Sequence, residues 1–246
     1  MASADLIGQL RQFDTPTVVN SIDLFKVRRP DEGHMFHEIA CLFPELGVRV
    51  AHVVTMLYRS DSPPEPGYSL DFAQYLASIE SQPAPRIMVA QDLAERPQAV
   101  MFGEMNSSLL CALKCDAVVT NGGVRDMDAC RAYGFQAFGS FIHTSVGYGH
   151  IIDYGCPVTV GGLTVHPGDL LHGDPHGVAL VPANIAEYVP EACRAFQDVE
   201  AGALGVSRGT DFSAAAYVKA RDTLRQKMGE LSKRFSQIGC EQTASA

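Results

Sequence analysis

Between residues 86 and 142, short apolar runs alternate with segments of helical periodicity, and this alternation limits the fold more than any other feature of the chain. Arg86–Ala90, Ala117–Thr120 and Phe135–Ile142 have the length and composition of buried strands. The segments between them, which open at Gly103 and at Asp128, have the apolar spacing of helices. Strands that alternate with helices in this way form parallel β/α units, so the sequence predicts an α/β fold.

Glycines mark the predicted turns between strands. Asn-Gly-Gly at 121–123 follows the middle strand and is predicted to turn the chain there. The Gly-Gly pair at 161–162 lies between Pro157–Val160 and Leu163–Val165, so these two segments form a predicted tight hairpin. Gly47–Tyr58 is rich in β-branched residues and is a further predicted strand.

Helices are predicted on both sides of this region. Thr15–Leu24 begins with Thr-Pro, which suits an N-cap followed by proline in the first turn. Ser69–Ser78 is a second predicted helix, and from Ala183 the chain is mostly helical, including Phe212–Phe235. The last residues, Gln242–Ala246, are expected to form a frayed tail.

Composition and charge exclude several classes of function. The 246 residues include 19 Lys and Arg against 28 Asp and Glu, a net charge of −9 with no basic cluster, so nucleic acid is not an expected partner. No run approaches a transmembrane helix, and the N-terminal residues lack the apolar core of a signal peptide. The seven scattered cysteines contain no CxxC pair, which is typical of reduced thiols, and Cys111 and Cys115 most simply pack a helix. We therefore expect a cytoplasmic protein with no membrane partner.

The best candidate site combines residues 103–104 with residues 123–126. The first-turn N–H groups of the helix that follows Gly103 can bind an anion such as a carboxylate. Arg125 follows a Gly-Gly pair after a strand, where an arginine can clamp a carboxylate or stabilise an oxyanion. Glu104 and Asp126 supply the hard oxygen ligands that Mg²⁺ prefers. From the residues alone, the alternative is a glutamate in a helix's first turn and a surface Arg–Asp pair.

Two other groups of residues are weaker candidates. His172, Asp174 and His176 could share one face of a strand, but the Gly and Pro between them indicate a turn, so a metal site there is not favoured. His143 and His150 flank a glycine-bearing loop and could act as general acid or base near neutral pH. A structural histidine whose nitrogens are bonded elsewhere is the alternative for each of these two residues.

The spacing of the candidate residues and two flanking motifs relate the chain to a known family. Positions 105–124 separate Glu104 from the pair Arg125-Asp126, Thr-Pro-Thr stands at 15–17, and GGLTVHPGDLLHGDPHGVALVP at 161–182. On these motifs, which touch most of residues 12–205, the chain resembles the RraA-like family. That family includes the class II 4-hydroxy-4-methyl-2-oxoglutarate/4-carboxy-4-hydroxy-2-oxoadipate aldolases.

The resemblance implies a fold and an assembly. The expected architecture is a β/β/α swivelling-domain sandwich, with residues 1–246 as a single RraA-like domain and additional C-terminal helices from about residue 206. Relatives of this kind assemble as trimers or hexamers with active sites between subunits. A homotrimer or homohexamer is therefore expected.

The resemblance also implies roles for three side chains. Arg125 would bind substrate and stabilise a pyruvate enolate. Asp126 would hold Mg²⁺ or Mn²⁺, and Glu104 would support a metal-bound water. Glu200, on a later helix of a neighbouring subunit, would complete the water shell of the metal.

Backbone groups have an implied role as well. In the family, amides that follow the glycine matching Gly103 hold the substrate carboxylate. In this chain those amides belong to Met105 and Asn106.

The implied function is that of a divalent-metal-dependent carbon–carbon lyase. It would cleave a 2-oxo acid through a metal-bound pyruvate enolate, with oxaloacetate decarboxylation as a side activity. Two alternatives stay open: a non-catalytic RraA-type regulator of a ribonuclease, which typically lacks the Asp at 126, and a different metal-dependent reaction on a related oxo or hydroxy acid.

Three departures from the family pattern leave the substrate open. Glu104 stands where characterised aldolases usually have Asp, and one methylene can move a ligand by about 1 Å. Asn121 stands where Asp-Gly is common. The chain also has additional residues at 61–81 and past residue 205, which are expected to reshape the substrate pocket.

Overall fold

The computed structural model describes residues 2–244, which form two compact units. The first unit is Gly33–Val181, and the second joins Ala2–Glu32 to the chain from Pro182 onward. All candidate site residues belong to the first unit except Glu200, which belongs to the second.

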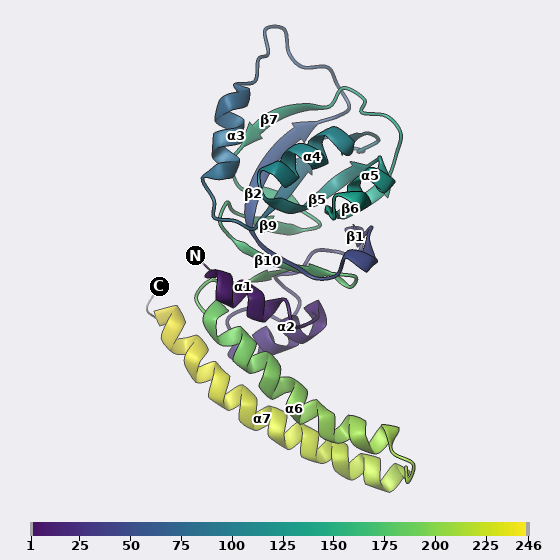
Figure 1. The fold of residues 1–246 in the computed structure, drawn as a ribbon. Helices are drawn as coiled ribbons and strands as arrows, with labels where there is room; N and C mark the ends of the chain where they lie inside the picture. Colours follow the sequence, from purple (N-terminus) through teal and green to yellow (C-terminus); the bar gives the residue numbers. More distant parts are fainter. Residues whose placement is uncertain (1, 245–246) are drawn as a thin grey trace. The chain divides into compact units, whose positions relative to one another are not determined.

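The first unit is built on a mixed sheet that has nine strands among the described residues (Figure 1). Neighbouring strands follow the order β1-β6-β5-β3-β2-β10-β11, while β4 pairs with β5 and β7 with β2. The bounds are Ala40–Cys41 (β1), Arg49–Arg59 (β2), Arg86–Asp92 (β3), Val100–Phe102 (β4), Cys115–Val124 (β5), Gln136–Ile142 (β6), His150–Tyr154 (β7), Leu170–Asp174 (β10) and Gly177–Val181 (β11). The central strands β2, β3, β5 and β6 are parallel, which confirms the predicted β/α units.

Alternate side chains of these strands enter cores on the two faces of the sheet. On one face, Met56 and Tyr58 pack in a cluster with α3 (Phe72–Glu80), α4 (Glu104–Ala112) and α5 (Met127–Ala132). On the other, Val53 and Val89 pack with Val158 of the hairpin formed by β8 (Val158–Val160) and β9 (Leu163–Val165). Helices on one face and a β-hairpin on the other make the predicted β/β/α sandwich.

Of the two turns predicted at glycine pairs, the structure confirms one and contradicts the other. Gly161 and Gly162, with φ of 54° and 75°, join β8 to β9 as predicted. The turn predicted at residues 121–123 is wrong, because β5 continues through it and pairs with β4 and β6. A Cβ at Gly123 would lie 2.6 Å from the ring of Phe141, so this glycine allows close packing within the sheet.

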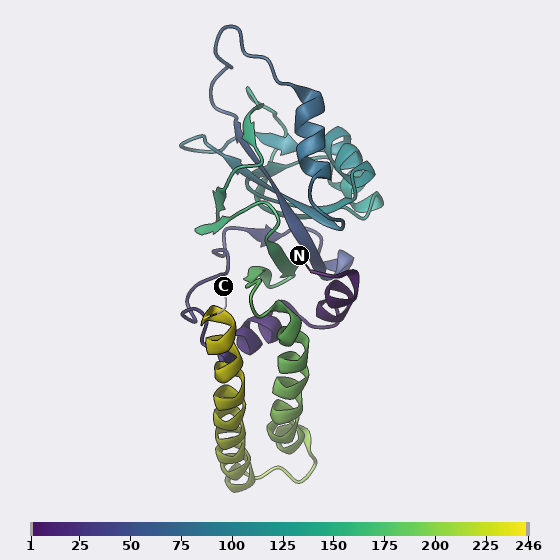
Figure 2. The same ribbon diagram turned by 90° about the vertical axis from the view of Figure 1, so that its left-hand side faces the viewer.

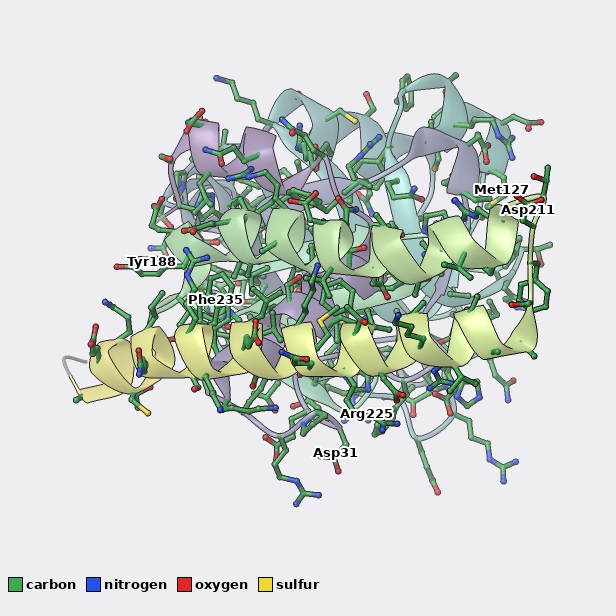
Figure 3. The ribbon with its side chains drawn as sticks, turned by 90° about the horizontal axis from the view of Figure 1, so that it is seen from below. Asp31, Met127, Tyr188, Asp211, Arg225 and Phe235 are labelled. Atoms are coloured by element: carbon green, nitrogen blue, oxygen red, sulfur yellow. The ribbon has the colours of Figure 1, made fainter. Side chains whose placement is uncertain are left out.

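The second unit is helical and contains a hairpin of two long helices, α6 (Val189–Arg208) and α7 (Ala214–Ala244). The two helices lie side by side in Figures 1 and 2, and in Figure 3 Phe235 lies between them, with Asp211 at their connection. The remaining elements are α1 (Ala4–Leu10), α2 (Thr15–Ile22) and the 3₁₀ turns η1 (Asp23–Phe25) and η3 (Ala186–Tyr188). Both α1 and α2 pack against α6.

The helix predictions hold with changes at their ends. α2 begins at Thr15, but its N-cap is Asp14, whose carboxylate accepts from the N–H of Thr17 at 2.9 Å. The C-terminal helices are confirmed, although the boundary predicted at about residue 206 falls inside α6. Residues 242–244 continue α7, and the last two residues of the predicted tail lie outside the described part of the chain. That residues 1–246 act as a single domain stays a prediction.

Across residues 2–244, no helix has both the length and the apolar character needed to cross a membrane.

Candidate active site

The predicted site residues meet where β5 ends and α4 begins. Arg125 and Asp126 directly follow β5, Gly103 is the N-cap of α4, and Glu104 is the first residue of that helix. The backbone N–H of Glu104 donates to Asp126 Oδ2 at 2.9 Å. The parallel pairing of β4 with β5 closes the long gap in the sequence between the two halves of the site.

The backbone of Asp126 sets the direction of its side chain. Its φ and ψ are 52° and 47°, a left-handed conformation that Asp and Asn adopt more readily than other residues with a side chain. Asp126 is the N-cap of α5, yet its carboxylate makes no cap hydrogen bond there. The carboxylate lies at the N-terminus of α4 instead, where the helix dipole favours negative charge.

Arg125 is held at the wall of the site by two contacts. Its Nη1 donates to the carbonyl oxygen of Thr144 at 3.2 Å, and its Nε lies 3.6 Å from Asp126 Oδ2. The side chain is 41% exposed, so this ion pair adds little stability. Its effect is to orient a guanidinium that remains accessible to a ligand.

Tyr133 is a site residue that sequence reasoning missed. Its hydroxyl donates to Glu104 Oε1 at 3.2 Å and orients that carboxylate. The same hydrogen bond raises the pKa of Tyr133 above its ordinary value, so the phenol stays a donor to Glu104 further into the alkaline range. In the sequence Tyr133 is only the last residue of a short predicted helix, and no pattern connects it to a glutamate 29 positions earlier.

The first turn of α4 retains backbone donors for a ligand. The first hydrogen bond within the helix runs from the N–H of Ser107 to the carbonyl oxygen of Gly103, so the N–H groups of Met105 and Asn106 have no acceptor within the helix. The Asn106 side chain donates to the carbonyl oxygen of Met101 at 2.5 Å and leaves the helix N-terminus clear. That these N–H groups bind a carboxylate stays a prediction.

These groups line one cavity of about 410 Å³, and the residues around it include Gly103, Glu104, Met105, Asn106, Arg125 and Asp126. A cation such as Mg²⁺ keeps several waters and needs only one or two carboxylates, so Glu104 and Asp126 fit it as a donor set. No cluster of three or more His, Cys, Asp or Glu that could hold a metal occurs among the residues that the structure describes. Glu200 lies on α6 and is not part of this wall, so its role stays a prediction.

The weaker candidates have structural partners. His172 and Asp174 are buried in β10, and His176 Nδ1 lies 3.2 Å from Asp174 Oδ1. Gly173 lies within this strand, so the turn begins only after Asp174. His150 Nδ1 lies 2.9 Å from the carbonyl oxygen of Tyr148. These contacts agree with structural roles.

His143 lies near the candidate site residues. It lines a shallow cavity of about 490 Å³ together with Arg125 and Asp126. Its ring packs edge-on against Phe141, with centroids 6.3 Å apart.

The family model described as Aldolase/RraA matches residues 15–180, more than half of the chain. The chain belongs to the RraA-like family. The match covers β1 to β10 and all the candidate residues except Glu200, so the resemblance seen in the motifs is confirmed.

Two curated relatives match short stretches of this RraA-like chain. One is named "Putative 4-hydroxy-4-methyl-2-oxoglutarate aldolase", from Halalkalibacterium halodurans, and is 37% identical over 75 residues, 29% of this chain and 34% of that protein. The other is Protein DlpA of Legionella pneumophila, 30% identical over 66 residues, 26% of this chain and 11% of that protein. The chain thus spans much less than two thirds of either relative.

Two solved structures share the fold over most of the RraA-like chain. An uncharacterized protein from Pseudomonas syringae has a TM-score of 0.70 and 20% identity, covering 90% of this chain and 95% of that one. RraAS2 of Streptomyces coelicolor, described as an unusual member of the RNase ES inhibitor RraA protein family, has a TM-score of 0.63 and 18% identity, covering 82% and 97%. At these identities the likeness shows the fold.

Proposed function

We propose that this RraA-like chain is a divalent-metal-dependent carbon–carbon lyase that acts on a 2-oxo acid. The observation that carries the proposal is the convergence of Glu104, Arg125 and Asp126 on one cavity at the N-terminus of α4. The family's description as Aldolase/RraA and the relative named as an aldolase support it at the level of the family.

The proposed reaction breaks the C3–C4 bond of a 4-hydroxy-2-oxo acid. The electron pair of that bond moves toward C3 and the 2-oxo oxygen, the 4-hydroxyl loses its proton, and C4 leaves as a carbonyl compound. Protonation at C3 then gives pyruvate. In oxaloacetate the same bond breaks with CO₂ as the leaving group.

Each site residue has a part in this reaction. The N–H groups of Met105 and Asn106 bind the substrate carboxylate, as the start of a helix favours an anion. The guanidinium of Arg125 stabilises the negative charge that develops on the 2-oxo oxygen. Glu104, oriented by Tyr133, accepts the 4-hydroxyl proton directly or through water.

Asp126 and Glu104 would hold the cation, Mg²⁺ or Mn²⁺, with Asp126 as the direct ligand. When bound, the cation supplies a Lewis acid for the carboxylate and 2-oxo oxygens of the substrate. Glu200 of a neighbouring subunit belongs to the same proposal. Assembly as a trimer or hexamer is supported by exposed apolar side chains beside the cavity, namely Met105, Ile142, Val146 and Tyr148.

The test is pyruvate release from oxaloacetate, with and without Mg²⁺, by wild type, Asp126→Asn and Asp128→Asn. Asparagine keeps the size and the left-handed backbone of Asp126 but removes its charge, so we expect metal-dependent release to fall by at least about a hundredfold. Asp128 is a matched control, because it lies two residues further along α5 with a fully exposed side chain.

Metal-dependent release that survives in Asp126→Asn would contradict the proposal. Recovery of a ribonuclease with the protein, combined with no metal-dependent release by wild type, would favour the non-catalytic regulator instead.

A further inference from the structure

A second cavity, of about 320 Å³, adjoins the candidate active site. Met101, Asn106 and Gly149 line both cavities. The rest of its wall comes from β2, β4, α3, α4, β7 and the segment before α3, all within the first unit. A ligand anchored at Arg125 can therefore extend past the shared wall into this space.

The wall of the second cavity is aromatic and aliphatic. Phe72 and Tyr75 pack with ring centroids 5.8 Å apart, and Tyr68 packs against His150 at 5.3 Å. Leucines and two methionines are among the other residues that line it. Aromatic rings and thioethers present an adaptable apolar surface that suits a ring or a branched alkyl group.

The two tyrosine hydroxyls of this wall are engaged within it. The hydroxyl of Tyr68 donates to the carbonyl oxygen of Ile151 at 2.6 Å, and that of Tyr75 donates to the sulfur of Met56 at 3.6 Å. Among the described residues that line the cavity, none is Lys or Arg. The basic side chain in the wall is that of His150, whose Nδ1 lies 2.9 Å from the carbonyl oxygen of Tyr148. A carboxylate placed here would lose its water without meeting a lysine or an arginine, which is costly.

The segment that the sequence predicts to depart from the family pattern supplies much of this wall. Tyr68, Leu70, Phe72 and Tyr75 all lie within the additional residues 61–81. The departure therefore falls where a substituent of the substrate would be recognised, whereas Arg125 and Asp126 lie outside it.

We propose that the second cavity binds an apolar substituent, aryl or branched alkyl, carried at C4 of the 2-oxo acid substrate. The inference rests on the proposed lyase function and names its substrate class. Cleavage breaks the C3–C4 bond, moves the 4-hydroxyl proton and yields pyruvate with an aryl or alkyl carbonyl compound. A substrate with a second carboxylate at this position is disfavoured, because that carboxylate would have no lysine or arginine among the residues that line the wall.

Three non-cleavable probes test the cavity by calorimetry on the full chain with Mg²⁺: 2-oxo-4-phenylbutanoate, 2-oxobutanoate and 2-oxoglutarate. They share the 2-oxo acid end and differ in the substituent. We expect the phenyl probe to bind at least about tenfold more tightly than 2-oxobutanoate, because the ring buries apolar surface. We expect 2-oxoglutarate to gain no such advantage.

A substitution that fills the second cavity tests the same assignment. Leu109→Trp on α4 places an indole in the second cavity and is expected to weaken the phenyl probe about tenfold, with 2-oxobutanoate binding unchanged. Leu204→Trp, at a position on α6 that is 42% exposed, is the control and should change neither. If Leu109→Trp does not fold, as judged by circular dichroism, Leu70→Arg replaces it. The added guanidinium should then weaken the phenyl probe and strengthen 2-oxoglutarate.

The outcomes separate the two proposals. Pyruvate release from oxaloacetate, with equal affinity for the phenyl probe and 2-oxobutanoate, would overturn the cavity assignment and keep the lyase. Tight phenyl binding that Leu109→Trp weakens, with no pyruvate release from oxaloacetate or from 4-hydroxy-2-oxo-4-phenylbutanoate, would keep the cavity assignment and overturn the lyase. Failure of all three probes to bind would overturn the cavity assignment.

Discussion

Asp126 contacts the N-termini of two helices, α5 through its backbone carbonyl and α4 through its carboxylate. Its backbone carbonyl accepts from the N–H of Cys130 at 3.0 Å and starts α5, while its carboxylate accepts from the N–H of Glu104 at the start of α4. The left-handed backbone makes both contacts compatible. A residue fixed in this way presents its remaining oxygen lone pairs to the cavity with little freedom to move, which is the condition for a preorganised ligand.

Gly103 is predicted to be essential for space at the site. Its φ is −148°, which any residue adopts, but a Cβ there would lie 2.5 Å from Asp126 Oδ2 and 2.9 Å from Arg125 Cγ. Gly103→Ala should therefore displace both side chains and lower kcat/KM for oxaloacetate by about a hundredfold, with little change in Tm.

Gly205→Ala on α6 is the control for this prediction, because a Cβ there meets nothing within 4 Å. Alanine is a better helix former than glycine, so that variant should keep full activity and equal or higher Tm. Full activity in Gly103→Ala would show that the site tolerates the extra methyl group and would contradict the packing argument.

Only part of the site could be predicted from single residues. Gly103, Glu104, Arg125 and Asp126 were predicted correctly as neighbours, because their spacing along the chain is itself a motif. The hydroxyl of Tyr133 and the carbonyl of Thr144 come from the end of α5 and from a loop after β6, and their contacts depend on the folded sheet. No local pattern carries that information.

At the scale of elements, β5 shows why a local turn motif can mislead. Asn-Gly-Gly favours a turn in isolation, but residues 121–123 stay in β5. Gly123 pairs with Val100 of β4 and with Phe141 of β6, and these pairings keep the strand extended. Gly122 lies against the hydroxyl of Tyr58, as Gly123 lies against Phe141. Glycine is needed at these two positions because side chains of other strands, Tyr58 and Phe141, pack against them. The residues around position 122 give no sign of those contacts.

The attachment of α7 within the second unit is predicted to depend on Phe235. Its side chain is fully buried, and the centroid of its ring lies 5.0 Å from that of Phe25. The backbone of Gly239, one turn further along α7, also lies close to the backbone of Phe25. Phe235→Ala should lower the free energy of unfolding by about 3–5 kcal/mol, measured by urea denaturation.

Phe212→Ala is the matched control, since that ring is 55% exposed in the connection between α6 and α7. Its effect should stay within about 0.5 kcal/mol. Equal losses in the two variants would mean that the hairpin is not held through the Phe25 contact.

At the scale of the whole molecule, alkaline pH is predicted to destabilise the fold. Burial raises the pKa of Cys115 from its ordinary value of 9.0 to about 12, and burial also raises the pKa values of Tyr58 and Tyr75. The folded chain keeps protons that the unfolded chain releases. Its stability is therefore complete below about pH 9 and falls as the pH rises toward 12, by up to about 1.4 kcal/mol per pH unit for each such group.

Urea denaturation between about pH 8 and about pH 11 measures this slope. Cys115→Ala removes one of these groups and should reduce the slope between about pH 9 and pH 10, before the tyrosines of the unfolded chain ionise. Part of the slope should remain, because burial also raises the pKa of Cys193 to about 11. A free energy of unfolding that stays constant over the whole range would contradict the prediction.

The fold was more predictable than the site because it rests on many weak, repeated signals. Three apolar runs and the helical segments between them were enough to give β3, β5 and β6 with α4 and α5 in the correct order. The positions of β4 and β7 could not be derived, since β4 is only three residues long and β7 joins the sheet beside β2, which is far away in the sequence. Pairing of that kind is decided by the whole core.

The connection between β2 and β3 has a further consequence. It forms the aromatic wall of the second cavity, yet the side chains proposed for bond cleavage come from α4 and the end of β5. Recognition and cleavage are therefore encoded in separate stretches of the gene. Descendants of one ancestor could exchange or lengthen this connection and acquire new substrates while the reaction stayed the same, and a protein engineer could do likewise by grafting residues 61–81 alone.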